Sequence, residues 1–214
     1  SELYRDVTEL KKRGLVQSRH VWRAVLPHAI ANRLAKRALE SIPNEVIIET
    51  ILYSGSERLI SSFSRRLGYL HDCDPAIAIV NEWLAPEGLI GKEDCNFNSF
   101  GMVVFKNIAP VAPEKTLEAI ERAVNGNDGE KFASRDNPGF YEFVKLLHQL
   151  AYDPKLFERC VNIICLYALS EKPNERNKSI RDTLKSLFHT HLSGTRATID
   201  ARINVINELV DSED

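Results

Sequence analysis

The sequence predicts an all-α protein, a HEAT-like antiparallel helical array (an α-solenoid) that follows a short N-terminal β-hairpin. Pro75, Pro113 and Pro154 each stand at the start of a helix-like segment, and they recur at intervals of 38 and 41 residues. Proline suits the first helical position because its missing N–H has no intrahelical partner there. From Pro27 onward, apolar residues recur at spacings of three and four, which is typical of amphipathic helices. A repeat of about 40 residues is typical of stacked helical pairs.

The N-terminal stretch has a different pattern from the rest. Residues 2–13 place Leu3, Val7 and Leu10 at helical spacing, and Gly14 follows as a helix terminator. Residues 15–18 and 21–25 are β-prone runs separated by two residues, which favours a hairpin. A helix followed by a hairpin is the final part of a winged-helix unit. A loop between two helices is the alternative.

Helical patterns then continue to the end of the chain. Residues 28–41 carry Ile30, Leu34, Ala38 and Leu39 on one face, and an apolar stripe along residues 196–210 ends in an acidic tail. We expect a partial winged-helix junction with a linking helix over residues 1–42 and a helical repeat array over residues 43–214. The remaining helices are expected at residues 43–53 and 57–69, followed by antiparallel pairs at 74–83 with 98–108, 113–124 with 139–151, and 154–169 with 179–189.

Polar turn-forming segments separate these helices. The segments at residues 86–88, 125–129 and 172–175 are rich in Pro, Gly, Asn and Asp, and they are expected to be surface loops. The stretch from residue 85 to 97 is the longest irregular one. Long loops are where binding residues tend to concentrate.

The composition limits the classes of protein to consider. The chain has 214 residues, of which 43% are apolar, and 28 Lys and Arg are balanced by 30 Asp and Glu. This balance argues against a protein whose entire surface binds nucleic acid. Charged residues interrupt every apolar run before the length of a membrane span, so no span is expected. The single methionine is Met102, and we therefore expect the chain to be a fragment of a larger protein.

The cysteines predict no disulfide or metal site. Cys73, Cys95, Cys160 and Cys165 are separated by 22, 65 and 5 residues, which matches no Cys-x-x-Cys spacing. We expect buried thiols in a reducing compartment, which places the protein in the cytoplasm.

No catalytic set stands out, and we expect a protein that is not an enzyme and holds neither cofactor nor metal. His189 and His191 lie two residues apart, a spacing that points two side chains to different sides of a helix. Gly88 and Gly91 precede Lys92, but a phosphate loop requires four residues between its glycines and Ser or Thr after its lysine. An enzyme remains an alternative only if the fold brings together four residues, His71, Asp72, Asp74 and His148.

Basic residues gather near the N-terminus. They form a candidate phosphate-contacting set in a winged-helix unit, with a solvated face or contacts to another domain as the favoured explanation. The candidate nucleic-acid-binding residues are Lys11, Lys12, Arg13, Arg19 and Arg23.

Several runs resemble a known family. The runs at residues 10–16 (LKKRGLV) and 21–35 (VWRAVLPHAIANRLA) look like the end of the winged-helix segment that follows the ATPase core in large bacterial STAND-type P-loop NTPases. Further runs are similar to the helical region downstream of that core: SFSRRLGYLHD at 62–72, NIAPVAPE at 107–114, LAYDP at 150–154 and HLSGT at 191–195.

The resemblance implies that this chain is a helical arm without a nucleotide-binding site of its own. It implies that the phosphate loop and the magnesium-binding acid lie upstream of Ser1, so that nucleotide is bound only through a domain absent from this chain. What remains is a helical arm that links ATPase and sensor in proteins of signalling and antiviral defence. We therefore expect a non-catalytic scaffold or relay module with a protein or interdomain partner, and a nucleic-acid-binding module is the alternative.

Overall fold

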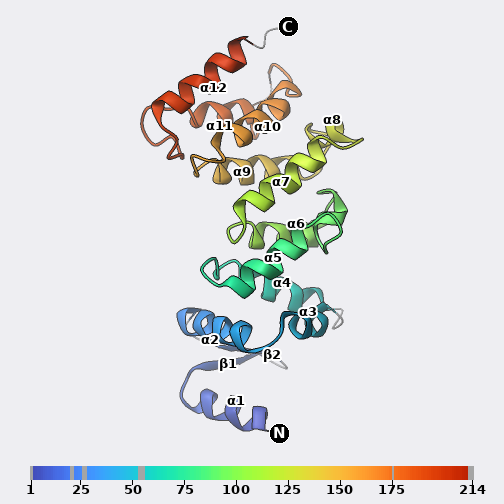
Figure 1. Cartoon of the computed structure of the whole chain (residues 1–214), viewed down its shortest axis with the longest axis vertical. Helices are drawn as coiled ribbons and strands as arrows, with labels where there is room; N and C mark the ends of the chain where they lie inside the picture. Colours follow the sequence, from blue (N-terminus) through green and yellow to red (C-terminus); the bar gives the residue numbers. More distant parts are fainter. Residues whose placement is uncertain (1, 20–21, 26–27, 53–55, 175, 212–214) are drawn as a thin grey trace.

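The computed structural model describes residues 2–19, 22–25, 28–52, 56–174 and 176–211. Its described residues are predominantly helical, which confirms the all-α class, and the elements follow one another along the longest axis of an elongated molecule (Figure 1). After the N-terminal elements the helices are α2 (His28–Ser41), α3 (Asn44–Leu52), α4 (Glu57–Leu67), α5 (Asp74–Leu84), α6 (Ser99–Ile108), α7 (Pro113–Val124), α8 (Gly129–Phe132), α9 (Phe140–Leu150), α10 (Phe157–Leu169), α11 (Ile180–Ser186) and α12 (Ile199–Asp211), with a short 3-10 helix η1 (Gly91–Glu93) between α5 and α6.

The N-terminal elements are a helix and two short strands. Helix α1 (Glu2–Lys12) ends at Gly14, whose φ of +70° is a left-handed conformation that glycine adopts without steric cost. Strands β1 (Val16–Arg19) and β2 (Trp22–Val25) pair antiparallel, with Val16 opposite Val25. Helix α1 packs against β1, and Val16 is buried.

From α3 onward, helices that are not consecutive in the chain contact each other in two series. Helix α4 packs on α6, and α9 packs on α11. In the second series α5 contacts α3 and α7, while α10 contacts α7 and α12. Consecutive helices join the two series where α10 packs against both α9 and α11.

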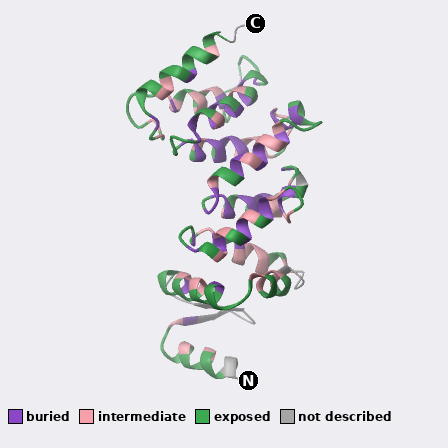
Figure 2. Ribbon diagram, in the orientation of Figure 1, coloured by how far each residue is buried: buried purple, intermediate pink, exposed green. Residues whose placement is uncertain are grey.

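A continuous apolar core runs through the middle of the molecule. Burial is concentrated between α4 and α11 and falls off toward α1 and α12 (Figure 2). Aromatic rings link neighbouring helices, since Phe105 of α6 and Phe132 of α8 both lie edge-on to Phe143 of α9. Such edge-to-face pairs add to the stability that comes from burial alone.

Several polar contacts join residues that lie 36 to 38 positions apart in the sequence. The guanidinium of Arg122 donates to the carbonyl of Leu84, 38 residues earlier, at 2.7 Å. Three more contacts span 36 to 38 residues, namely Lys106 with Glu142, Arg135 with Glu171, and Arg159 with Glu121. These separations are close to the 38-residue interval between Pro75 and Pro113.

Two glycines one interval apart make the same close approach. A Cβ at Gly91 would lie 1.8 Å from the carbonyl oxygen of Ala85, and one at Gly129 would lie 1.8 Å from that of Val124. The chain therefore folds back on the end of α5 and of α7 in the same way. Only glycine permits this approach.

Several expectations about individual elements were wrong. Pro75 and Pro113 lie at the starts of α5 and α7, but α10 begins at Phe157, three residues after Pro154. Hydrogen bonds hold Pro154 in a turn instead, because Lys155 N–H donates to the Asp153 side chain and Leu156 N–H to the Asp153 carbonyl. The expected loop at residues 125–129 leads directly into helix α8.

The packing partner of α6 and the buried side of α2 also differ from expectation. Helix α6 packs chiefly on α4 rather than on α5, its expected partner. In α2 the expected inward stripe is split, because Leu39 is buried whereas Ile30, Leu34 and Ala38 are exposed.

Candidate functional site

The five candidate nucleic-acid-binding residues lie on two elements. Lys11 and Lys12 are exposed in the last turn of α1, and Arg13 directly after it pairs with Glu9 at 3.0 Å. Arg19 and Arg23 occupy backbone positions of the paired strands, where the register sets Arg23 opposite Ser18. The side chains of these two arginines lie outside the described part of the structure.

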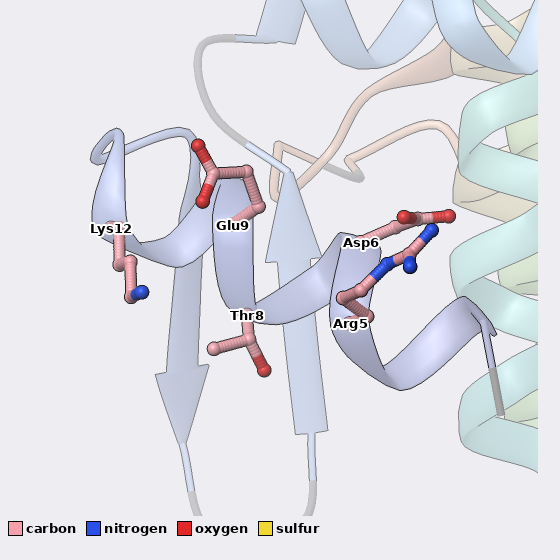
Figure 3. Close-up of a pocket in the computed structure, with 5 residues that line it drawn as sticks. All are labelled: Arg5, Asp6, Thr8, Glu9 and Lys12. Carbon is pink, nitrogen blue, oxygen red and sulfur yellow. The ribbon is translucent and has the colours of Figure 1, made fainter.

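The surface of α1 beside these residues carries both signs of charge. A shallow hollow of about 520 Å³ follows this helix (Figure 3). Its lining is Arg5, Asp6, Thr8, Glu9 and Lys12, and Figure 3 shows Arg5 and Asp6 on one side of the helix and Glu9 and Lys12 on the other. Because Asp6 and Glu9 line it together with Arg5 and Lys12, this hollow is not a purely cationic phosphate site.

A larger polar pocket of about 560 Å³ lies where three loops meet, and we call it the loop-edge pocket. It is lined mainly by polar side chains: Asp94, Asn96, Asn127, Asp128, Lys131, Asp136 and Asn137. Of these loops, the one at residues 85–97 stands out in the sequence only by its length. The shared Asn-rich and Asp-rich composition of the turns near residues 94–96 and 125–128 is the signal that could have joined them.

Strained backbone and a buried thiol lie on the wall of this pocket. Asp94 and Cys95 both have positive φ, 43° and 59°, which costs side-chain-bearing residues free energy. The Cys95 thiol lies 3.6 Å from the Ala119 carbonyl, and burial raises its pKa to about 12. A thiol with such a pKa stays protonated at neutral pH and is a poor nucleophile.

The four residues of the enzyme alternative do not converge. Asp72 forms an ion pair with Lys36 of α2 at 2.8 Å, whereas Nε2 of His148 in α9 lies 3.1 Å from the Ser186 hydroxyl of α11. Partial burial lowers the pKa of His148. Across the described ranges, no three His, Cys, Asp or Glu side chains gather closely enough to hold a metal ion.

The histidine pair, the glycine–lysine segment and the cysteines have structural explanations. His189 and His191 follow α11 rather than lie in it, and both are exposed. Gly91 allows a close approach to the Ala85 carbonyl, so the Gly88 to Lys92 segment is a tight connection after α5. Each of the four cysteines is a free thiol, and only Cys165 is not fully buried.

Apolar side chains are exposed at both ends of the helical series. On α2, Ile30 and Leu34 are one turn apart and exposed. On α12 the exposed side chains follow one stripe, and their exposed fractions are 66% for Ile199, 47% for Ile203, 42% for Ile206 and 61% for Val210. Exposed apolar stripes of this kind are a feature of surfaces that bind another protein segment.

Comparison with known proteins adds no relative. No protein-family model matches the sequence, and no curated protein or solved structure is significantly similar to it. Among the helices in the described ranges, none has both the length and the apolar character that crossing a bilayer requires.

Proposed function

We propose that this chain is a non-catalytic scaffold or relay module that binds protein segments or neighbouring domains through the ends of its helical series. One observation carries the proposal: the continuous apolar core lies between α2 and α12, and both of these end helices expose apolar side chains. An enzyme concentrates polar groups in a pocket, whereas a stack of helices with apolar ends offers surface to other helices.

The proposed architecture is a HEAT-like α-solenoid over residues 43–214, attached to a partial winged-helix junction over residues 1–42. The contacts of α5, α7 and α10 with the helix before and after in one series support it, as do the polar contacts that recur after 36 to 38 residues. In such arrays each repeat contacts only its neighbours, so a change at one end transmits through a chain of similar interfaces. This is what a relay between domains requires.

The parent protein that we propose is a STAND-type NTPase of signalling or defence in the bacterial cytoplasm. Support comes from the runs at residues 10–16 and 62–72 that resemble this family, and from four free thiols, which suit a reducing compartment. Nucleotide would then be bound by another domain and not by this chain.

Two measurements on the purified chain test the proposal. Isothermal titration with Mg-ATP should give no saturable binding, and a phosphate-release assay should give no turnover above buffer. Affinity capture should retrieve the same protein with the wild-type chain and with V103S, a variant of an exposed residue of α6, but less of it with L34E or I203E. Saturable ATP hydrolysis, or capture that is equal for all variants, contradicts the proposal.

A nucleic-acid-binding module is the second candidate function. Lys11 and Lys12 favour it, because they are exposed in the last turn of α1 next to the paired strands. A gel-shift series should then show affinity falling steeply between about 50 and 200 mM salt. Substituting all five candidate residues, Lys11, Lys12, Arg13, Arg19 and Arg23, with Ala should abolish the shift. No shift at low salt, or an unchanged shift with this variant, rejects it.

A further inference from the structure

We propose that the exposed stripe of α12 binds an amphipathic helix that carries arginine or lysine beside its own apolar stripe. The inference rests on the proposed function and names the chemistry of one partner and the surface that it uses. We call this surface the α12 stripe, and its residues are Ile199, Ile203, Ile206 and Val210.

Helix α12 has two apolar faces, and only one of them is covered. Val205 is buried and Leu209 packs against the core, on the side where α12 contacts α10. The α12 stripe follows the spacing i, i+4, i+7, i+11, and it points about 110° around the helix from Val205 and Leu209. A surface helix that packs on one neighbour needs a single apolar face. The second face fits a helix that lies between two neighbours.

Acidic residues border the α12 stripe on the side away from α10. Asp200 and Asp211 are exposed and lie about 100° around the helix from the stripe. Glu208 lies about 170° from the stripe, on the opposite face, and does not border it. Arg202 lies about 70° from the stripe on the side of α10, where it donates a hydrogen bond to the His189 carbonyl. A helix seated on the stripe therefore has α10 on one side and carboxylates on the other. Basic side chains are the complement to this border.

The same chemistry joins two helices inside the molecule. In α7, Glu121 receives two hydrogen bonds from the guanidinium of Arg159 in α10, at 2.8 and 2.6 Å, and Glu114 lies 4.0 Å from the same group. In this contact the earlier helix supplies the acids and the later helix supplies the base, whereas between α6 and α9 Lys106 comes first and Glu142 second. Helix α12 continues this series beyond α10 and again carries acids.

This border also argues against a second copy of the chain as the occupant. Two α12 stripes packed together would bring Asp200 and Asp211 of both copies to the edges of one interface. Like charges at close range oppose association. The partner helix therefore differs from α12 in the sign of its charge.

Two synthetic helical peptides of about 18 residues test the proposal, a length that covers the stripe with a turn to spare. Both carry leucine at i, i+4, i+7 and i+11, and one has arginine beside the stripe where the other has glutamate. Titration against the full chain should give binding of the arginine peptide at least about tenfold tighter than of the glutamate peptide, a difference of about 1.4 kcal/mol.

Three variants of the chain locate the site. The I203S variant should weaken the arginine peptide at least about tenfold, whereas V103S, which changes an equally exposed apolar residue of α6, should leave its affinity unchanged. Neutralising the border with D200N/D211N should remove both the preference for arginine and the salt dependence of binding. Circular dichroism of each variant confirms that it is folded.

Three outcomes of these experiments would contradict the proposal. Equal affinity for the two peptides, or no binding of either, rejects a basic amphipathic helix. Light scattering that shows a concentration-dependent dimer of the wild-type chain but not of I203S identifies a second copy as the occupant instead. Failure here leaves the scaffold function separately testable, because capture through the exposed residues of α2 and the absence of ATP turnover do not depend on the α12 stripe.

Discussion

Glu171 is the most constrained charged residue in the described structure. It has an exposed fraction of only 4%, and its carboxylate accepts the backbone N–H groups of Ile180 and Arg181 at 2.9 and 3.1 Å. The guanidinium of Arg135 adds a bond at 3.1 Å. This one side chain therefore caps the start of α11 and ties it to the loop before α9.

We predict that Glu171→Ala lowers the free energy of unfolding by about 3 to 5 kcal/mol, because it removes the buried acceptor of two backbone N–H groups and the carboxylate that pairs with Arg135. Urea unfolding followed by circular dichroism measures the change. The matched control is Glu130→Ala at an exposed position, which should stay within about 0.5 kcal/mol of wild type. A loss below about 1 kcal/mol for Glu171→Ala would show that water replaces these bonds.

The same carboxylate predicts a dependence of stability on pH. Burial raises the pKa of Glu171, but the hydrogen bonds from Ile180, Arg181 and Arg135 outweigh it, so its pKa is lowered in the folded state. A lowered pKa contributes stability above the unfolded value of about 4.3, and this contribution disappears as the pH falls through the folded value. Wild type should therefore lose more stability below about pH 4.3 than Glu171→Gln does. Parallel pH profiles for the two proteins contradict this assignment.

At the scale of elements, the contact between α7 and α10 joins two helices through one arginine–glutamate pair. Arg159 and Glu121 are 35% and 29% exposed at their side chains, so solvent weakens their attraction, while the two parallel hydrogen bonds strengthen it.

A double-mutant cycle with Arg159→Ala and Glu121→Ala should give a coupling free energy of about 1 kcal/mol that decreases with added salt. The comparison pair is Lys115 with Glu118, within α7, which should give about 0.3 kcal/mol. Equal coupling in the two cycles would mean that the contact between helices adds nothing beyond an exposed ion pair.

Element boundaries were predictable where local chemistry decides them. Pro75 and Pro113 mark α5 and α7 because the N–H that each lacks would have no partner in a first helical turn. Pro154 failed as a marker because the Asp153 turn delays the start of α10, and contacts from far along the chain also hold that junction. The Thr195 hydroxyl donates to the Ala151 carbonyl and the Arg196 N–H to the Tyr152 carbonyl. No local pattern contains such bonds.

The candidate sites were predictable to a smaller extent. The exposure of Lys11 and Lys12 agrees with their sequence pattern, and so does the apolar stripe of α12. The loop-edge pocket was missed, because its loops at residues 94–96, 126–128 and 136–138 become neighbours only when the helices pack together. The exposure of Ile30 was missed as well, because periodicity identifies an apolar face without showing whether anything covers it.

At the scale of the whole molecule, the elongated arrangement predicts a large radius of gyration. A compact domain of 214 residues has a radius of gyration of about 17 Å. Small-angle X-ray scattering of the monomer should give a clearly larger value, with a pair-distance distribution skewed to long distances. A value of about 17 Å with a symmetric distribution would show that the helices collapse into a globule.

The central claim is that the exposed ends of the helical series bind other protein segments while its buried centre only supports them. Hydrogen–deuterium exchange of the chain, alone and with the protein that it captures, tests this claim most directly. The account predicts that partner binding protects α2, α12 or both, and leaves exchange in α6 and α9 unchanged. Protection confined to the loop-edge pocket around Asp94, Asp128 and Asp136 would contradict it.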